Sequence, residues 1–164
     1  MQEYLKQMRS GFVLGGDIHH YFSEPFGLGL KYNYNAYKYS TMDFDDRNKL
    51  NYIALSALNR VIARSGNEFL FGANMGYQSY LDKLQSSGTA LKISGGTVGF
   101  GLEIGYAIRL AQSAKLFFNL ALMSATISKI NVESDGRKET IKLDKNEMEG
   151  LGRLELTVGM HFGH

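Results

Sequence analysis

Large apolar residues alternate with small or polar residues, at a period of two, through most of this chain. The clearest run covers residues 26–39, FGLGLKYNYNAYKY. An extended strand here would carry two different faces: Leu28, Leu30, Tyr32, Tyr34 and Ala36 on one, and Gly27, Gly29, Lys31, Asn33 and Asn35 on the other. Residues 11–22 alternate in the same way, and Ser23, Glu24 and Pro25 separate the two runs. The pattern therefore predicts an antiparallel β-hairpin.

Five further runs share this rhythm. The candidate strands are then residues 11–22, 26–39, 50–62, 69–81, 97–108, 116–130 and 151–162. Short turns follow the first, third and fifth strands, at residues 23–25, 64–67 and 111–113. Longer polar segments, predicted to be loops, follow the second, fourth and sixth, at 41–49, 82–92 and 131–149. Short turns at one end and long loops at the other are typical of outer-membrane barrels. The sequence thus predicts an all-β, antiparallel, up-and-down transmembrane β-barrel, as a single domain over residues 1–164.

The composition also favours strands over helices. The chain has 164 residues, with 19 Gly, 10 Tyr and 10 Phe, but only 1 Pro and no Cys. Aromatic residues favour strands, and proline interrupts their hydrogen-bond ladders. No run approaches the roughly 20 apolar residues of a membrane helix, since Asn119 interrupts the longest, residues 116–123. The net charge of +2, with no dense basic cluster, gives no indication of nucleic-acid binding.

The residues on the polar face indicate which side of the strands is enclosed. A solvated face should carry lysine, glutamate and threonine, because glycine weakens strands. This face is instead rich in glycine, at positions 27, 29, 72, 76, 99, 101 and 105. Small residues suit the interior of a narrow eight-stranded barrel, which is barely wide enough for side chains. The sequence therefore predicts that the apolar face points outward to lipid. The alternative is a soluble lipocalin-like barrel with its apolar face inward.

Three segments carry a resemblance to a known family: GFVLGGDIHHYFSEPFGLGLKYNYNAY, GTVGFGLEIGYAI and RLELTVGMHF. They resemble the small eight-stranded outer-membrane β-barrel proteins of Gram-negative bacteria, the porin-like outer membrane protein beta-barrel domain family. The resemblance covers residues 11–162 and implies a location in the outer membrane, among lipid and lipopolysaccharide. In that family the closing strand is read by the barrel-assembly machinery, and Leu156, Val158, Met160 and Phe162 match its alternating, aromatic-ended pattern.

The strand count departs from this family, whose barrels have an even number of strands. Seven candidate strands imply that a first strand, together with the signal peptide, precedes Met1 in the full-length protein. Residues 1–10, which are polar, are then expected to be the remnant of a loop. Residues 11–22 and 151–162 should be unpaired edges unless another strand fills the gap. We expect a monomer if that strand is supplied, and edge-paired chains otherwise.

Catalytic or metal-binding chemistry would depend on the four histidines, His19, His20, His161 and His164. Adjacent strand residues point to opposite faces, so His19 and His20 cannot chelate one ion together. All four histidines fall at the short-turn end, away from the outer leaflet where a lipid-modifying enzyme of this architecture would act. We therefore expect no catalytic, cofactor or metal site, and an ordinary polar role for His19, His161 and Asp17 inside the barrel.

Charged residues on the enclosed face form the main candidate site: Asp17, Lys31, Glu103, Arg153 and Glu155, with Arg60 as a further candidate. Lone charges are costly in a poorly solvated interior, so these residues are expected to pair across the lumen. Such a network would either fill the barrel and stabilise the fold, or line a narrow pore with a small conductance. The function expected is an integral outer-membrane barrel with a structural or surface-interaction role. The alternatives are a narrow porin-like channel, a lipid-modifying enzyme and a soluble lipocalin-like binder.

Overall fold

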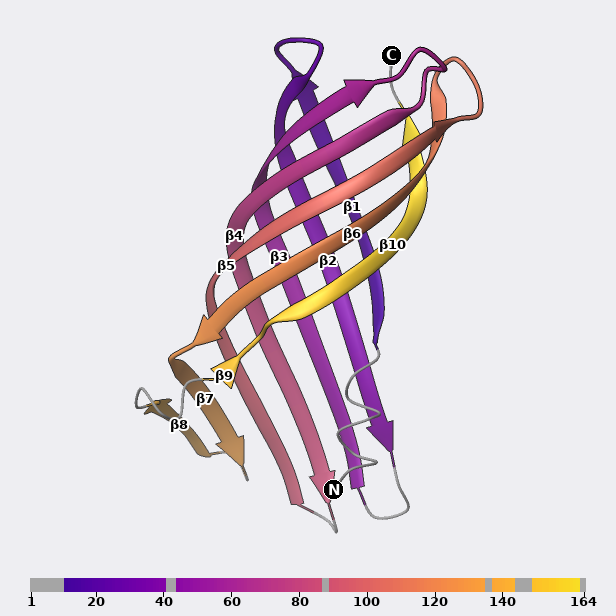
Figure 1. The fold of residues 1–164 in the computed structure, drawn as a ribbon. Helices are drawn as coiled ribbons and strands as arrows, with labels where there is room; N and C mark the ends of the chain where they lie inside the picture. Colours follow the sequence, from indigo (N-terminus) through magenta and orange to yellow (C-terminus); the bar gives the residue numbers. More distant parts are fainter. Residues whose placement is uncertain (1–10, 41–43, 87–88, 135–136, 144–148, 163–164) are drawn as a thin grey trace.

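The computed structural model describes residues 11–40, 44–86, 89–134, 137–143 and 149–162, and these residues form strands and turns without a helix. The strands are β1 (Phe12–Tyr21), β2 (Phe26–Ser40), β3 (Phe44–Ile62), β4 (Glu68–Ser86), β5 (Thr89–Arg109), β6 (Ala114–Ile127), β7 (Lys129–Ser134), β8 (Arg137–Lys142), β9 (Glu149–Gly150) and β10 (Arg153–Phe162). They form one sheet that curls into a half-barrel (Figure 1). The predicted all-β, antiparallel fold is confirmed. The described part of the chain contains no helix long and apolar enough to cross a membrane.

Seven strands form the body of the sheet, in the order β1-β2-β3-β4-β5-β6-β10, and every neighbouring pair is antiparallel. They correspond to the seven strands predicted from the alternation. The three predicted short turns are also confirmed, because they connect β1 to β2, β3 to β4, and β5 to β6. All three lie at the upper end of the sheet in Figure 1. The β3–β4 turn contains Gly66, whose φ of 82° is a conformation that glycine adopts without strain.

The predicted loops are largely wrong. β2 and β3 pair from Phe26↔Asn59 to Ser40↔Asp45, and β4 and β5 remain paired as far as Ser86↔Thr89, so most of 41–49 and 82–92 is strand. The segment 131–149 is mainly the β7–β8 hairpin, and β7 pairs with β5 over residues 91–95. These extensions are polar, so the apolar alternation that defined the strands does not reach them. Instead, backbone hydrogen bonds extend the pairing of the same strands beyond their apolar parts.

Burial in this sheet is inverted relative to a soluble protein. The enclosed, concave side contains Lys31, Asn33, Asn35, Asn74 and Gln78, all of them buried. The opposite side carries large apolar residues that are exposed along every body strand, including Leu14, Leu30, Leu55, Met75, Phe100, Leu102, Leu122 and Leu156. The predicted outward direction of the apolar face and enclosure of the polar face are therefore confirmed for the described residues.

The ends of the strand order are β1 and β10. Within the described residues β1 pairs with β2, and β10 with β6, so each leaves one backbone edge open, as the odd strand count predicts. Six successive antiparallel pairings separate them, and β1 and β10 therefore run in the same direction. The expectations for residues 1–10 lie outside the described residues.

Candidate functional site

The middle of the enclosed face is centred on an ion pair between Lys31 on β2 and Glu103 on β5. The Lys31 Nζ atom lies 2.5 Å from the Glu103 Oε2 atom, and the two side chains are only 7% and 5% exposed. Asn119 Nδ2 also donates to Glu103 Oε2, at 3.0 Å. Asp17 on β1 lies 3.9 Å from Lys31. One lysine thus faces two carboxylates, and these charges offset part of the cost of burying it.

Asp17 also contacts His19, whose Nδ1 atom lies 3.6 Å from the carboxylate. The other ring nitrogen, Nε2, is 3.0 Å from Ser56 Oγ on β3. Both ring nitrogens of His19 therefore have a polar partner on the enclosed side. The described residues contain no group of three or more His, Cys, Asp or Glu arranged to hold a metal ion. His164 lies outside the described residues.

A second cluster lies closer to the long-loop end and is centred on Arg153 and Glu155, both on β10. Arg153 Nε donates to Glu155 Oε1 at 2.6 Å, and Arg153 Nη1 donates to Gln78 Oε1 on β4 at 2.9 Å. Asn33 Nδ2 on β2 donates to Glu155 Oε2 at 2.9 Å. These bonds cross the concave side from β10 to β2 and β4, so the sheet is curled tightly enough for opposite walls to touch.

A third cluster lies at the short-turn end around Glu68, whose side chain is fully buried. Lys115 Nζ donates to Glu68 Oε1 at 2.6 Å, and Arg60 Nη1 lies 3.7 Å from the same oxygen. The Arg60 guanidinium also stacks on the Tyr21 ring, 3.8 Å from its centroid. The sequence pattern pointed to Arg60 but missed Glu68 and Lys115, because the predicted strands start at residues 69 and 116. Both missed residues are in phase with the enclosed face.

Apolar side chains separate these polar clusters along the lumen. Near the short turns, Leu58, Leu70 and Ala107 form a buried group against Tyr21 and Phe117. At the other end, Leu50, Tyr80 and Ile127 are buried together, and Tyr37, Ile93, Ile130, Leu143 and Leu151 pack against them. The interior is therefore filled in layers, and the five predicted charges belong to two clusters of a layered core.

Glycine on the enclosed face makes room for these side chains, most clearly at Gly72 on β4. A β-carbon added to Gly72 would lie 2.5 Å from Glu103 Cγ and 2.6 Å from Glu103 Oε1. Any larger residue must displace the carboxylate that pairs with Lys31. The enrichment in glycine thus reflects close packing around buried charges.

Replacement of Gly72 by valine is therefore expected to destabilise the fold by about 1–3 kcal/mol, the usual cost of overpacking a filled core. The control is Ala73→Val, which adds two carbon atoms, against three for Gly72→Val, at the adjacent position on the exposed, outward face. The free energy of unfolding, measured by denaturant titration of both variants, checks this prediction. Equal destabilisation by the two substitutions would contradict the close packing described at Gly72.

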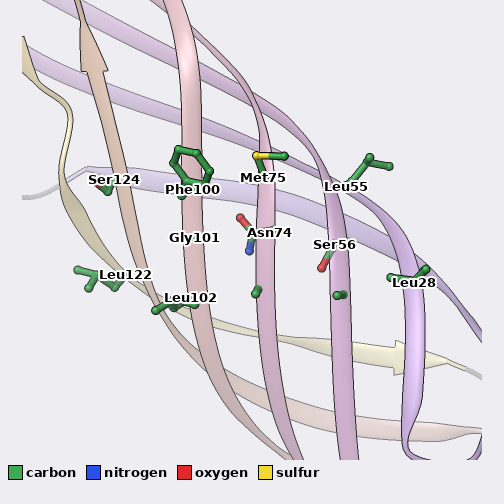
Figure 2. Close-up of a pocket in the computed structure, with 12 residues that line it drawn as sticks. Leu28, Leu55, Ser56, Asn74, Met75, Phe100, Gly101, Leu102, Leu122 and Ser124 are labelled. Atoms are coloured by element: carbon green, nitrogen blue, oxygen red, sulfur yellow. The ribbon is translucent and has the colours of Figure 1, made fainter.

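The outward face carries a hollow of about 600 Å³ whose lining comes from β2 to β6 (Figure 2). It arises because two small residues, Ala57 and Ala73, are paired between Leu28 and Leu102 in the sheet register. Its outward-facing lining is predominantly leucine, methionine, phenylalanine and alanine. Such a surface can accommodate an apolar chain and offers no charged group to a polar substrate.

The chain matches no family model, no curated protein and no solved structure. The inverted burial and the filled interior are therefore the features that indicate its function.

Proposed function

We propose that this chain is an integral β-barrel protein of the bacterial outer membrane, with a structural or surface-interaction role and no catalytic activity. The observation that carries the proposal is the inverted burial of the sheet. Ion pairs and amides lie inside, whereas leucine, phenylalanine, valine and isoleucine are exposed over the outward face of every body strand. Soluble proteins rarely expose apolar patches of this extent, and a hydrocarbon layer is the environment that stabilises them.

The layered interior favours a plugged barrel over the alternative of a channel. Three ion-pair clusters and three buried apolar groups fill the described part of the concave side from one end to the other. Conduction would require these groups to separate in a space that holds little water. The buried polar side also argues against a lipocalin-like binder, whose ligand cavity would be lined by the apolar face.

The outward face of β10 supports the proposed route of assembly. Leu154, Leu156, Val158 and Phe162 are all exposed on it, and its open edge has backbone groups available for pairing. This is the combination that the resemblance to outer-membrane barrels implies for recognition by the barrel-assembly machinery. Outer-membrane location and this partner are parts of the same proposal.

The test is whether folding depends on an apolar phase. The denatured chain should fold in zwitterionic detergent or phosphatidylcholine vesicles, with a heat-dependent shift in gel mobility and protection of the strands from protease. In aqueous buffer it should aggregate. A stable, monodisperse, folded protein in buffer without detergent would overturn the proposal.

Planar-bilayer recordings on the folded protein should show no discrete conductance, and regular single-channel steps would overturn the plugged interior.

A further inference from the structure

The sheet has an open seam, formed by the backbone edges of β1 and β10 that have no partner strand among the described residues. Both edges lie in the apolar part of the fold, because Ile18 on β1 and Leu156 on β10 are 82% and 74% exposed. The edges border the same opening, since Asp17 on β1 and His161 on β10 are close enough to interact electrostatically. Unpaired backbone N–H and C=O groups are costly in lipid. We therefore expect another strand to cover the seam.

Asp17 is the most exposed charged residue in the three clusters of the enclosed side. Its side chain is 41% exposed, whereas the other charged side chains of these clusters are at most 15% exposed. Asp17 belongs to the edge strand β1, which pairs with β2 on its other side, so it lies beside the open seam. A strand that covers the seam would bury this carboxylate, and a buried carboxylate is costly unless a cation or hydrogen-bond donors compensate it.

The cluster around Lys31 has too little positive charge to compensate a fully buried Asp17. The Lys31 Nζ atom lies 2.5 Å from Glu103 Oε2 but 3.9 Å from Asp17 Oδ2, so Glu103 is the main partner of this lysine. The other ion-pair partner of Asp17 among the described residues is His19. A histidine side chain is mostly neutral at pH 7. The cluster thus has two carboxylates for one lysine.

Positive charge elsewhere on the enclosed side does not fill this need. The third cluster has two cations, Arg60 and Lys115, for the single carboxylate of Glu68. Both cations lie at the short-turn end, and among the described residues neither is an ion-pair partner of Asp17. In the second cluster, Arg153 already pairs with a carboxylate of its own strand. The local charge balance therefore favours a cation on the strand that covers the seam.

We propose that the open seam binds a β-strand whose lumen side carries a lysine or arginine facing Asp17 and whose outward side is apolar. When a strand adds to an open sheet edge, backbone hydrogen bonds supply the affinity and alternate side chains supply the specificity. The apolar outward side continues the exposed surface formed by Ile18 and Leu156. This proposal rests on the proposed function and specifies the chemistry of the strand that completes the sheet.

The experiment titrates fluorescent peptides into the protein, folded in zwitterionic detergent, and follows their anisotropy. The peptides have ten residues, the length of β1 and of β10. Each alternates leucine with serine, and a single lysine replaces each serine in turn, because the register of the added strand is not known in advance. A matched set carries glutamine in place of lysine. We expect one lysine position to bind at least about tenfold more tightly than its glutamine counterpart.

Three variants assign this preference to a carboxylate. Asp17→Asn keeps the Lys31–Glu103 pair, so it should fold and bind the lysine and glutamine peptides within about twofold of each other. Asp17→Lys should instead prefer a peptide with glutamate at the same position. The control, Glu133→Gln, removes a carboxylate that is 45% exposed on the β7–β8 hairpin, and it should keep the lysine preference of the parent protein.

Absence of peptide binding to the folded protein would overturn the seam as a strand-binding site. So would a stable dimer that no peptide dissociates, because a second copy would then occupy the seam. A lysine preference that is equal at every position, or that persists in Asp17→Asn, would overturn the assignment to Asp17. These failures are distinct from failure of the proposed function, in which the parent protein does not insert into phosphatidylcholine vesicles. If only the seam proposal fails, the protein still inserts.

Discussion

Leu30→Arg is expected to destabilise the protein in lipid by about 2–4 kcal/mol, the cost of a cationic side chain on the lipid face near the middle of a membrane. Leu30 is 63% exposed on the outward face of β2, so its removal creates no cavity. Any loss of stability must therefore come from placing the arginine charge in an apolar environment. Denaturant titration of the protein folded in phosphatidylcholine vesicles measures this change in the free energy of unfolding.

The matched control is Ile141→Arg. Ile141 is a partly exposed apolar residue on β8, in the hairpin beyond the apolar part of the outward face. It should change stability by no more than about 0.5 kcal/mol, as is usual for surface positions. A water-exposed outward face would make Leu30→Arg equally mild. Equal effects of the two substitutions would therefore contradict the membrane assignment.

Lys31→Met is expected to destabilise the fold by about 3–5 kcal/mol, because it leaves a buried carboxylate uncompensated. Glu103 is 5% exposed, and Asn119 would be its remaining hydrogen-bond donor. The double variant Lys31→Met/Glu103→Leu should lose less than the sum of the single variants, since both charges are then removed together. Denaturant titrations of the four proteins of this cycle give the coupling free energy.

The control for this cycle is the Lys92–Glu133 pair, which has the same chemistry on the surface. Its two side chains are 46% and 45% exposed. Lys92→Met should therefore cost less than about 1 kcal/mol. A similarly small cost for Lys31→Met would show that the interior is open to water, and a channel would then become the better interpretation.

Much of the fold could be predicted from the sequence, because the signal lies in the side chains that contact two different environments. Leu28, Leu30 and Tyr32 alternate with Gly29 and Lys31, and this alternation fixes both the strand and its enclosed side. The extensions of β2 to β5 and the β7–β8 hairpin could not be predicted in the same way. Polar residues predominate in these segments, with scattered apolar ones such as Leu84, Leu91 and Val132, so no regular alternation marks them in the sequence.

The candidate site was predicted in composition but not in arrangement. The Lys31–Glu103 and Arg153–Glu155 pairs were both among the expected charges. Their division into separate clusters depends on how tightly the sheet curls, which sequence alternation does not determine. Glu68 and Lys115 were missed because each lies at the turn-side end of its strand, where the phase is set by residues further along.

The common direction of β1 and β10 restricts how the half-barrel can be completed in a bilayer whose leaflets differ. One added strand of opposite direction would form antiparallel ladders with both. Two upright copies side by side would meet β1 to β10, and these seams would be parallel, the less stable pairing. Seams between like strands would be antiparallel, but one copy would then be upside down in the membrane relative to the other. The odd number of body strands thus favours one added strand that runs opposite to β1 and β10, and it disfavours pairing between copies of the chain.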